Sequence, residues 1–431
     1  MHLLSFTLVS ANKLEIGGLQ MHLHDINKLL NLQGVTVKRI SGPLDHTVYV
    51  TLEPIDSHQP CPGCGSVHTI RRGSSKPRHV RHLDIWGNHT LLILPTIRLS
   101  CKCCDLNFTW SYSFVEPKSR YTNVFKEMLA KSLDGGTVKH SITLLKVPYT
   151  SGERFIKQAL LKLIPLLQEQ VQAQAQNCQK LVIGIDDFAI RKGHTYNTGI
   201  HDLRNGSLLS VVKGRRCEEL LRNESLTQLA HSFSPFAVVM DLAKSYHNFA
   251  KEVFPNAIRI ADRFHVNRYI TDALHAIRKR ISKTLPIRQA KELKKNKNLL
   301  ERRNDSLDQK EEILLETLLK CSTELTQAYW FKEKLIDWYD YSNKRNARSL
   351  LETWIECGEH LNIPEIIEAL KTFKNWKVEI ANYHLCRFTN ASVEGRNNKI
   401  KALQRRSYFL RNRQIYEYRI YLECNSELLT A

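Results

Sequence analysis

The stretch Leu181–Ile190 reads LVIGIDDFAI, an apolar run that leads without a break into two carboxylates, Asp186 and Asp187. Apolar residues on both alternating faces predict a strand that is covered on both sides. Because unpaired carboxylates are costly where a strand leaves the core, we expect a cation or a hydrogen-bond network to hold them. The plainer alternative is an aspartate at an ordinary strand-to-turn junction, and the surrounding sequence decides between the two.

The segments that follow predict a mixed sheet. Residues 191–203 and 207–216 have the composition of two further strands, joined by short polar turns. A helix over 218–232 then precedes a second buried strand that ends in acid, FAVVMD, at Asp241. After it come a helix over 243–253 and a strand in AIRIADRFH.

This order of elements predicts which acids meet. Three antiparallel strands followed by helix, strand, helix and strand is the order of the ribonuclease H fold. In that fold the first and fourth strands are neighbours. We therefore expect Asp186 and Asp241 to lie side by side, which two unrelated turn aspartates would have no reason to do.

A third acid, Glu394, stands directly ahead of a basic run in TNASVEGRNNKIKALQRR, which predicts a helix with Asn390 as its cap. Hard divalent ions such as Mg2+ or Mn2+ prefer oxygen ligands, and two such ions can activate a water or a 3′-hydroxyl on a phosphodiester. Asp186, Asp241 and Glu394 would supply the charge that holds them. For Glu394 alone, the alternative is an acid that interacts with the helix dipole.

The stretch between Asp241 and Glu394 is too long for one loop and is rich in helix formers. Widely spaced aromatics among helix formers indicate an apolar core, so we expect an all-helical insertion within the catalytic fold. Four of the six tryptophans fall here, at Trp330, Trp338, Trp354 and Trp376. Stacking of a tryptophan on a flipped base is the alternative role for these rings.

A cysteine constellation lies towards the N-terminus, with CPGCG followed by CKCC. Two C-x2-C pairs on tight turns are what tetrahedral zinc needs, so we expect one structural zinc in a ribbon. The expected ligands are Cys61, Cys64, Cys101 and Cys104, with Cys103 as the competitor in the second pair. The nearby His68, His79 and His82 are expected at the surface of a basic stretch.

Residues 120–163 predict three short helices, over 121–133, 138–147 and a third capped by Thr150 or Ser151. Helices joined by tight turns resemble a helix-turn-helix module, whose last helix would enter a major groove. A helical linker is the alternative. Pro165 and the glutamine-rich run after it mark a linker or helix that leads to the central strand.

The chain carries a net charge of +20 with a pI near 9.5, which implies a polyanionic partner. The basic residues concentrate in 278–303 and 395–413, close to the candidate site, so we expect double-stranded DNA rather than an anionic membrane. The expected DNA contacts are Thr150, Ser151, Arg154, Lys157, Arg396, Lys399, Lys401, Arg405 and Arg406.

The sequence shows neither a membrane-spanning apolar run nor the pattern of a signal peptide. We therefore expect a cytoplasmic protein. Met21 could equally be the start of translation, so residues 1–20 are given no role.

Taken together, these blocks resemble the DDE transposases of bacterial insertion sequences, and most closely the ISL3 family. The resemblance spans about residues 55–420 and rests on CPGCG, GIDDFAIRKGHTY, VVMDLAKSYHNFAKEVFPNA, IADRFHVNR and TNASVEGRNNKIKALQRRSY. It implies that Asp186, Asp241 and Glu394 form the metal-binding triad. It also implies that Asp262 and His265 lie beside the site, where His265 would contact DNA or orient a carboxylate. One departure is an Asp at 187, where the family usually has Glu.

The expected architecture is multidomain α/β: a zinc ribbon, a helix-turn-helix, and a ribonuclease H-like core that a helical insertion interrupts. The expected bounds are 1–54 for an N-terminal segment, 55–112 for the zinc domain, 118–168 for the helix-turn-helix, 180–264 and 386–420 for the core, and 265–385 for the insertion. The expected function is a transposase, acting as a homo-oligomer, that cuts the terminal inverted repeats of its element and joins them to target DNA. A structure-selective nuclease and a non-catalytic DNA-binding regulator are the alternatives.

Overall fold

The computed structural model describes residues 6–10, 13–16, 19–85, 87–191, 195–223, 232, 234–407 and 412–429. The chain divides into two compact units, Met1–Leu163 and Ile164–Ala431. Among the described residues, no helix combines the length and the apolar character that crossing a bilayer requires.

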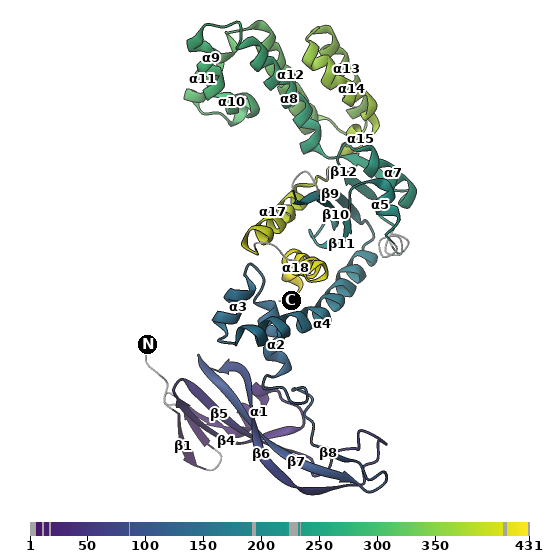
Figure 1. The fold of residues 1–431 in the computed structure, drawn as a ribbon. Helices are drawn as coiled ribbons and strands as arrows, with labels where there is room; N and C mark the ends of the chain where they lie inside the picture. The colour runs from purple at the N-terminus through teal and green to yellow at the C-terminus, as the bar shows by residue number, and fades with distance from the viewer. Residues whose placement is uncertain are drawn as a thin grey trace. The chain divides into compact units, whose positions relative to one another are not determined.

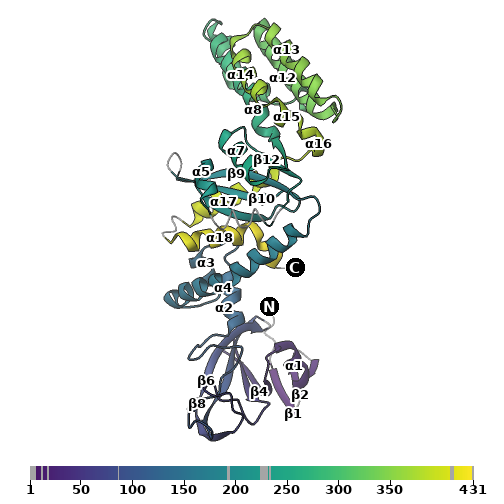
Figure 2. The ribbon, with the colours of Figure 1, turned by 90° about the vertical axis from the view of Figure 1, so that its right-hand side faces the viewer.

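The N-terminal unit is built on a sheet in the order β4-β5-β7-β6, with the short β8 paired to β7 (Figure 1). The strands before it, β1 to β3, form a separate antiparallel sheet, and α1 packs on β4 (Figure 2). The elements are β1 (Phe6–Ser10), β2 (Lys13–Ile16), β3 (Leu19–His22), α1 (Leu23–Leu30), β4 (Val35–Leu44), β5 (Thr47–Pro54), β6 (Thr69–Ile85), β7 (Asn88–Cys101) and β8 (Asn107–Thr109).

This sheet crosses the point where the sequence predicts a domain boundary. β5 pairs in parallel with β7, with Val50 opposite Leu92, so the strands before residue 54 share a sheet with the strands of the zinc domain. Buried side chains alternate along β5 and β7 and pack into one core, which includes Val48, Leu52 and Leu94. The structure therefore joins the predicted 1–54 segment to the 55–112 domain from β4 onward.

Three helices follow, close to the predicted positions. Thr122 caps α2 (Asn123–Lys131), and Thr137 caps α3 (Val138–Leu144); each hydroxyl accepts a backbone amide hydrogen. The prediction that Thr150 or Ser151 caps the third helix is wrong, because α4 (Tyr149–Gln176) begins at Tyr149 and both residues lie in its first turn. α4 also continues through Pro165.

The C-terminal unit contains a second sheet in the order β11-β10-β9-β12-β13. β9 and β12 are parallel neighbours, as predicted for the first and fourth strands. Its strands are β9 (Val182–Arg191), β10 (Thr195–Asp202), β11 (Leu208–Lys213), β12 (Ala237–Met240) and β13 (Ile258–Ala261). β9 is longer than predicted: it runs past the two aspartates because β10 continues to pair with it as far as Arg191.

Helices cover both faces of this sheet. α5 (Cys217–Leu221) and α7 (Lys244–Val253) lie on one side, and α17 (Ala391–Arg406) and α18 (Arg413–Asn425) lie on the other (Figures 1 and 2). α5 covers the start of the helix predicted over 218–232, and residues 224–231 fall outside the described part of the chain.

Between β13 and α17 the chain is helical, as predicted for the insertion. α8 packs against α12 and α14, and α13 packs against α14 (Figure 1). The helices are α8 (Arg263–Ile281), α9 (Ile287–Lys295), α10 (Lys297–Glu301), α11 (Gln309–Leu319), α12 (Thr323–Tyr341), α13 (Ala347–His360), α14 (Pro364–Asn375), α15 (Lys377–Ala381) and α16 (Tyr383–Cys386), with a 3-10 turn at Asn304–Ser306.

One continuous core joins the insertion to the sheet. It runs from Val239 of β12 through Ile270 of α8 into α12, α13 and α14. Trp338 and Trp354 are buried in it, as predicted, and the Trp354 ring stacks on Phe331 at 4.2 Å. Trp330 is 46% exposed, so the prediction that all four tryptophans form the core is wrong for this residue.

Candidate active site and metal centres

The sheet brings Asp186 and Asp241 together. Parallel pairing of β9 with β12 ends at Ile185 opposite Met240, and each strand places its next residue, an aspartate, at the end of that ladder. One ligand atom each from Asp186, Asp241 and His265 lie within 4.8 Å of one another. The first turn of α8, which directly follows β13, supplies the histidine.

Asp262 ties the elements around this site together. Its buried carboxylate accepts a hydrogen bond from the Asn390 backbone amide at 3.0 Å. Asn390 stands at the N-cap position of α17, as predicted, but its side chain donates to the Ile185 carbonyl of β9 at 3.2 Å and makes no capping bond to the helix. These two bonds fix the start of α17 beside β9 and the start of α8.

Asp186, Asp241 and His265 line a cavity with a volume of about 430 Å3. Glu394, in the first turn of α17, lines this cavity too. Within the described chain, the close group of ligand atoms consists of Asp186, Asp241 and His265, so Glu394 stands outside it. The three predicted triad residues therefore share one cavity, and two of them are in immediate proximity.

Asn397 was not predicted from the sequence as a residue of the site. This buried residue donates from Nδ2 to Asp186 Oδ2 at 2.8 Å. It lies two helical turns after Asn390, so the two amides share one face of α17, the face toward β9. That spacing was visible in the sequence, but nothing in it showed which face of the helix meets the sheet.

Burial makes the carboxyl groups hard to ionise. Desolvation first, and then the charges of Asp187 and Asp262, raise the pKa of Asp186 to about 7. Desolvation and the Asp186 charge raise the pKa of Asp241 to about 8. Desolvation lowers the pKa of His265 and raises that of Asp262. The site thus concentrates negative charge that water does not fully stabilise.

One oxygen of Asp241 has no donor. His265 Nε2 lies 3.0 Å from Asp241 Oδ1 but without the alignment of a hydrogen bond, and among the described residues this buried oxygen lacks a hydrogen-bond partner. A buried acceptor without a donor is costly, and a bound cation would satisfy it. The residues present therefore fit a divalent metal ion.

The predicted cysteines converge at a second centre. Cys61 Sγ lies 3.5 Å from Cys104 Sγ, and Cys64 Sγ lies 3.6 Å from Cys101 Sγ. All four sulfurs fall within 4.8 Å of one another. The competitor Cys103 points elsewhere, with its sulfur 3.0 Å from Ser66 Oγ.

Backbone amides donate to two of these four sulfurs. Gly63 N donates to Cys61 Sγ and Cys103 N donates to Cys101 Sγ, both at 3.4 Å. The bond from Cys103 is the first cause that lowers the pKa of Cys101 to about 6. Of the neighbouring histidines, His68 and His79 are exposed as predicted, whereas His82 is buried with its Nδ1 3.0 Å from Thr122 Oγ1.

Comparison with known proteins gives the family. Residues 183–420, more than half of the chain, match the model of the ISL3 family, which is described as a transposase. The chain belongs to the ISL3 family of transposases. Residues 57–104 of this transposase match a model described as the zinc-finger of transposases IS204, IS1001, IS1096 and IS1165.

Individual relatives agree with this result. The transposase is 24% identical, over 90% of its own length and 95% of the relative's, to the transposase for insertion sequence element IS1001 of Bordetella parapertussis. It is 25% identical to the transposase for IS1557 of Mycobacterium tuberculosis, over 54% of its length and 57% of the relative's.

Asp187 faces away from Asp186. Its carboxylate lies 3.6 Å from Arg215, and its charge adds to the burial that raises the pKa of Tyr246 on α7. Asp186 instead meets Asn397 of α17, on the opposite side of the sheet. The two neighbouring acids of the transposase therefore serve different faces, although Asp187 also borders the cavity, where Asn397 Nδ2 lies 3.5 Å from its backbone carbonyl.

The predicted DNA contacts of the transposase fall into two groups. Most are exposed or half-buried side chains: Thr150, Ser151, Arg154, Lys157, Lys399, Lys401 and Arg405. Arg396 is engaged inside the protein, where Nε donates to the Gly206 carbonyl at 2.9 Å, and Arg406 bonds to buried Glu423. Lys399 also lies 3.9 Å from Glu427. Lys401 lines the cavity beside Asp186.

Proposed function

We propose that this transposase binds the terminal inverted repeats of an insertion sequence, cleaves the DNA ends and joins the freed 3′-hydroxyls to target DNA. The observation that carries the proposal is the meeting of Asp186 and Asp241, from two parallel strands, in one cavity with Glu394. The protein would act on double-stranded DNA in the bacterial cytoplasm, and as a homo-oligomer, because two element ends have to be processed together.

The proposed ligands of the catalytic metal are Asp186, Asp241 and Glu394. Two Mg2+ or Mn2+ ions held there would supply the chemistry that activates a water or a 3′-hydroxyl and stabilises the leaving oxygen. Asn397 fixes the Asp186 carboxylate, and His265 stands against Asp241. Lys401, exposed at the edge of the cavity, would meet a phosphate of the substrate.

The proposed fold of the catalytic core is of the ribonuclease H type. Its support is the element order, three antiparallel strands followed by helix, strand, helix and strand, with β9 beside β12. The core would comprise 180–264 and 386–420, with the helical insertion over 265–385. In the N-terminal unit, α2, α3 and α4 would form a helix-turn-helix over 118–168, and the four cysteines would hold one structural zinc ion.

Cleavage of a labelled element end in Mg2+ tests this proposal. Asp186→Asn, Asp241→Asn and Glu394→Gln preserve shape but remove ligand charge, so each variant should lose cleavage almost completely while it still binds end DNA. If a variant still cleaves the DNA, the substituted residue is not a ligand of the catalytic metal. Binding without cleavage by the unaltered protein would instead support a DNA-binding regulator, and cleavage without preference for the element's ends would support a nuclease.

A further inference from the structure

A second cavity, with a volume of about 430 Å3, lies in the N-terminal unit where the loop over residues 116–121 meets α2 and α4. We call it the loop cavity. Its lining is strongly basic, since the charged residues there are Lys118, Arg120, Lys126, Arg154 and Glu116. An adjoining cavity of about 470 Å3 shares Lys118 and Arg120 and adds Arg78 and His79 of β6.

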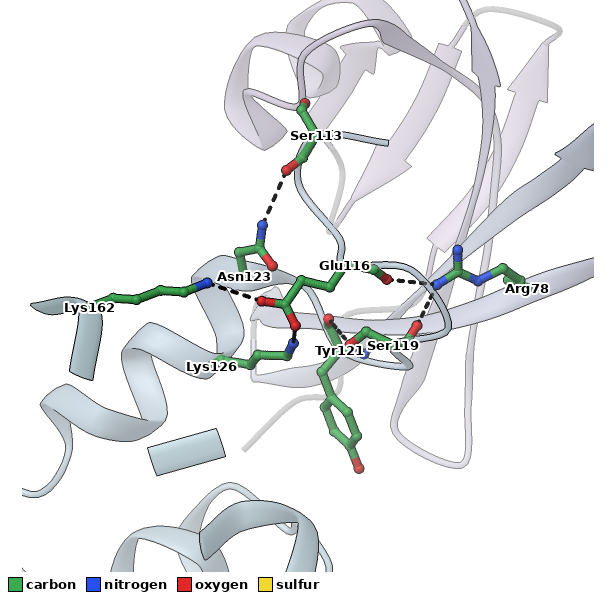
Figure 3. Close-up of polar contacts among 8 residues, drawn as sticks. All are labelled: Arg78, Ser113, Glu116, Ser119, Tyr121, Asn123, Lys126 and Lys162. Carbon is green, nitrogen blue, oxygen red and sulfur yellow. Dashed lines mark hydrogen bonds and ion pairs between the residues drawn. The ribbon is translucent and has the colours of Figure 1, made fainter. Parts of the chain in front are cut away.

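The one acid of the loop cavity is already neutralised. Glu116 accepts hydrogen bonds from Lys126 of α2 at 2.7 Å and from Lys162 of α4 at 3.1 Å (Figure 3). The bond from Lys126 is the first cause that lowers the pKa of Glu116. Glu116 therefore holds both helices to the loop and leaves the remaining cations of the cavity without a counter-charge.

Arg78 holds the loop in place from the other side. Its guanidinium donates to the Glu116 carbonyl at 3.3 Å and to the Ser119 carbonyl at 2.6 Å (Figure 3). The Ser119 hydroxyl donates to the Tyr121 carbonyl at 2.8 Å, which closes the turn. Lys118 is held at a φ of 58°, a left-handed conformation that costs a lysine energy and persists only where the surroundings fix it.

Lys118, Arg120 and Arg154 remain available to a ligand. All three are exposed, and within the described residues none of them has an ion pair or side-chain hydrogen bond to another part of the chain. Fixed cations on a rigid loop bind a polyanion at little ordering cost. Arg154 belongs to α4, the proposed recognition helix. A polyanion bound at the loop cavity would therefore also lie along that helix.

We propose that the loop cavity binds backbone phosphates of duplex DNA through Lys118, Arg120 and Arg154. This inference rests on the proposed binding of element ends and adds where their backbone is held. Phosphate contacts position a protein on the duplex and carry no sequence information. The loop would thus set the register in which α4 reads the bases.

The test measures binding of the full-length protein to duplex DNA over a series of salt concentrations. Substitution of Lys118, Arg120 and Arg154 together by Ala should weaken binding about tenfold on both an element end and a scrambled duplex. Each lost phosphate contact lowers the slope of log affinity against log salt by about 0.9, so the slope should fall by about 2 to 3. Arg154→Ala alone should lower it by about one.

The matched control removes the same charge elsewhere. Lys310, Lys344 and Arg345 are exposed cations of the helical insertion, and their joint replacement by Ala should leave the slope unchanged. An unchanged slope in the loop-cavity variant, or a loss confined to the element end, would overturn the inference. The inference would also be overturned if the loop-cavity variant had a smaller salt slope than the unaltered protein on duplex RNA but not on duplex DNA.

The outcome is separable from the proposed cleavage. The salt dependence of binding to scrambled duplex DNA can be measured without catalysis. If the unaltered protein does not cut DNA, the proposed function is wrong, but the result at the loop cavity still holds. Zinc content and thermal unfolding check that the triple variant folds. If it does not, Arg154→Ala alone decides the question.

Discussion

The two candidate metal centres of this transposase differ in how completely their side chains are arranged before a metal ion binds. At the cysteine centre, four sulfurs already lie within 4.8 Å of one another, and the backbone amides of Gly63 and Cys103 donate to two of them. At the acidic centre, burial and mutual repulsion raise the pKa values of Asp186 and Asp241, and Glu394 lines the same cavity outside the close group of ligand atoms.

This difference is the one expected between a structural metal site and the catalytic metal site that we propose. A structural zinc site is closed by four protein ligands, whereas a catalytic site leaves positions for substrate. The cysteine centre of this chain has the first character. The acidic centre, with a buried Asp241 oxygen that lacks a hydrogen-bond donor among the described residues, has the second.

The largest expected effect is on the cysteine centre. Cys64→Ser should release the zinc and unfold the end of the sheet where β6 begins and β7 ends, since structural zinc contributes on the order of 10 kcal/mol to folding in small domains. Metal analysis and hydrogen exchange of the purified protein measure both changes. Cys103→Ser is the control, because its sulfur points to Ser66, and it should retain the metal. Equal zinc loss in both variants would contradict the ligand assignment.

Next in size is the loss of an orienting contact at the acidic centre. Asn397→Ala removes the donor to Asp186 Oδ2 and should lower Mg2+-dependent cleavage about 10- to 100-fold, the usual cost of losing a group that orients a metal ligand. The neighbouring Asn398 is exposed, so Asn398→Ala should cleave at the normal rate. Normal cleavage by the Asn397 variant would show that Asp186 needs no such support.

A smaller effect concerns stability without divalent ions. The pKa of Asp241 rises from 3.8 to about 8 in the folded protein. The contribution of this carboxyl group to the free energy of unfolding is therefore fully present below pH 4 and is lost as pH rises toward 8. Asp241→Asn should therefore stabilise the C-terminal unit at pH 8 by about 1 to 2 kcal/mol, after allowance for partial exposure. At pH 4 it should not.

Denaturant unfolding of both proteins at the two pH values measures this effect. Asp272 is an exposed acid of α8, and Asp272→Asn should leave the pH dependence unaltered. A wild-type protein whose stability rises between pH 5 and 8 relative to the Asp241 variant would show that the carboxyl is held as an anion.

The smallest expected effect is at Asp187. Its carboxylate lies 3.6 Å from the guanidinium of Arg215, which is largely exposed. A surface ion pair of this kind contributes little to the stability of the fold. Asp187→Asn should change cleavage less than about threefold. Cleavage as low as that of Asp186→Asn would mean that both carboxylates of the pair reach the metal.

The sequence predicted those features that depend on local pattern. The C-x2-C spacing identified the four cysteines, and the apolar runs that end at Asp186 and Asp241 identified two strands that prove to be neighbours. It did not predict the pairing of β5 with β7, because strand partners far apart in the chain leave no local pattern.

Side-chain partners were equally hidden. The basic run after Glu394 suggested DNA contacts throughout, yet Arg396 bonds to the Gly206 carbonyl and Arg406 bonds to Glu423. Whether a cation faces solvent or a buried acceptor depends on which helix face meets the sheet. The same uncertainty concealed Asn397, which the structure places against Asp186.

The most direct test of the acidic centre counts divalent ions in the complex of the full-length protein with an element end. Mn2+ titration followed by electron paramagnetic resonance should find about two ions for the unaltered protein. Asp241→Asn and Glu394→Gln should each bind fewer ions while they hold the DNA as tightly. The same ion count in all three complexes would contradict the assignment of Asp241 and Glu394 as metal ligands.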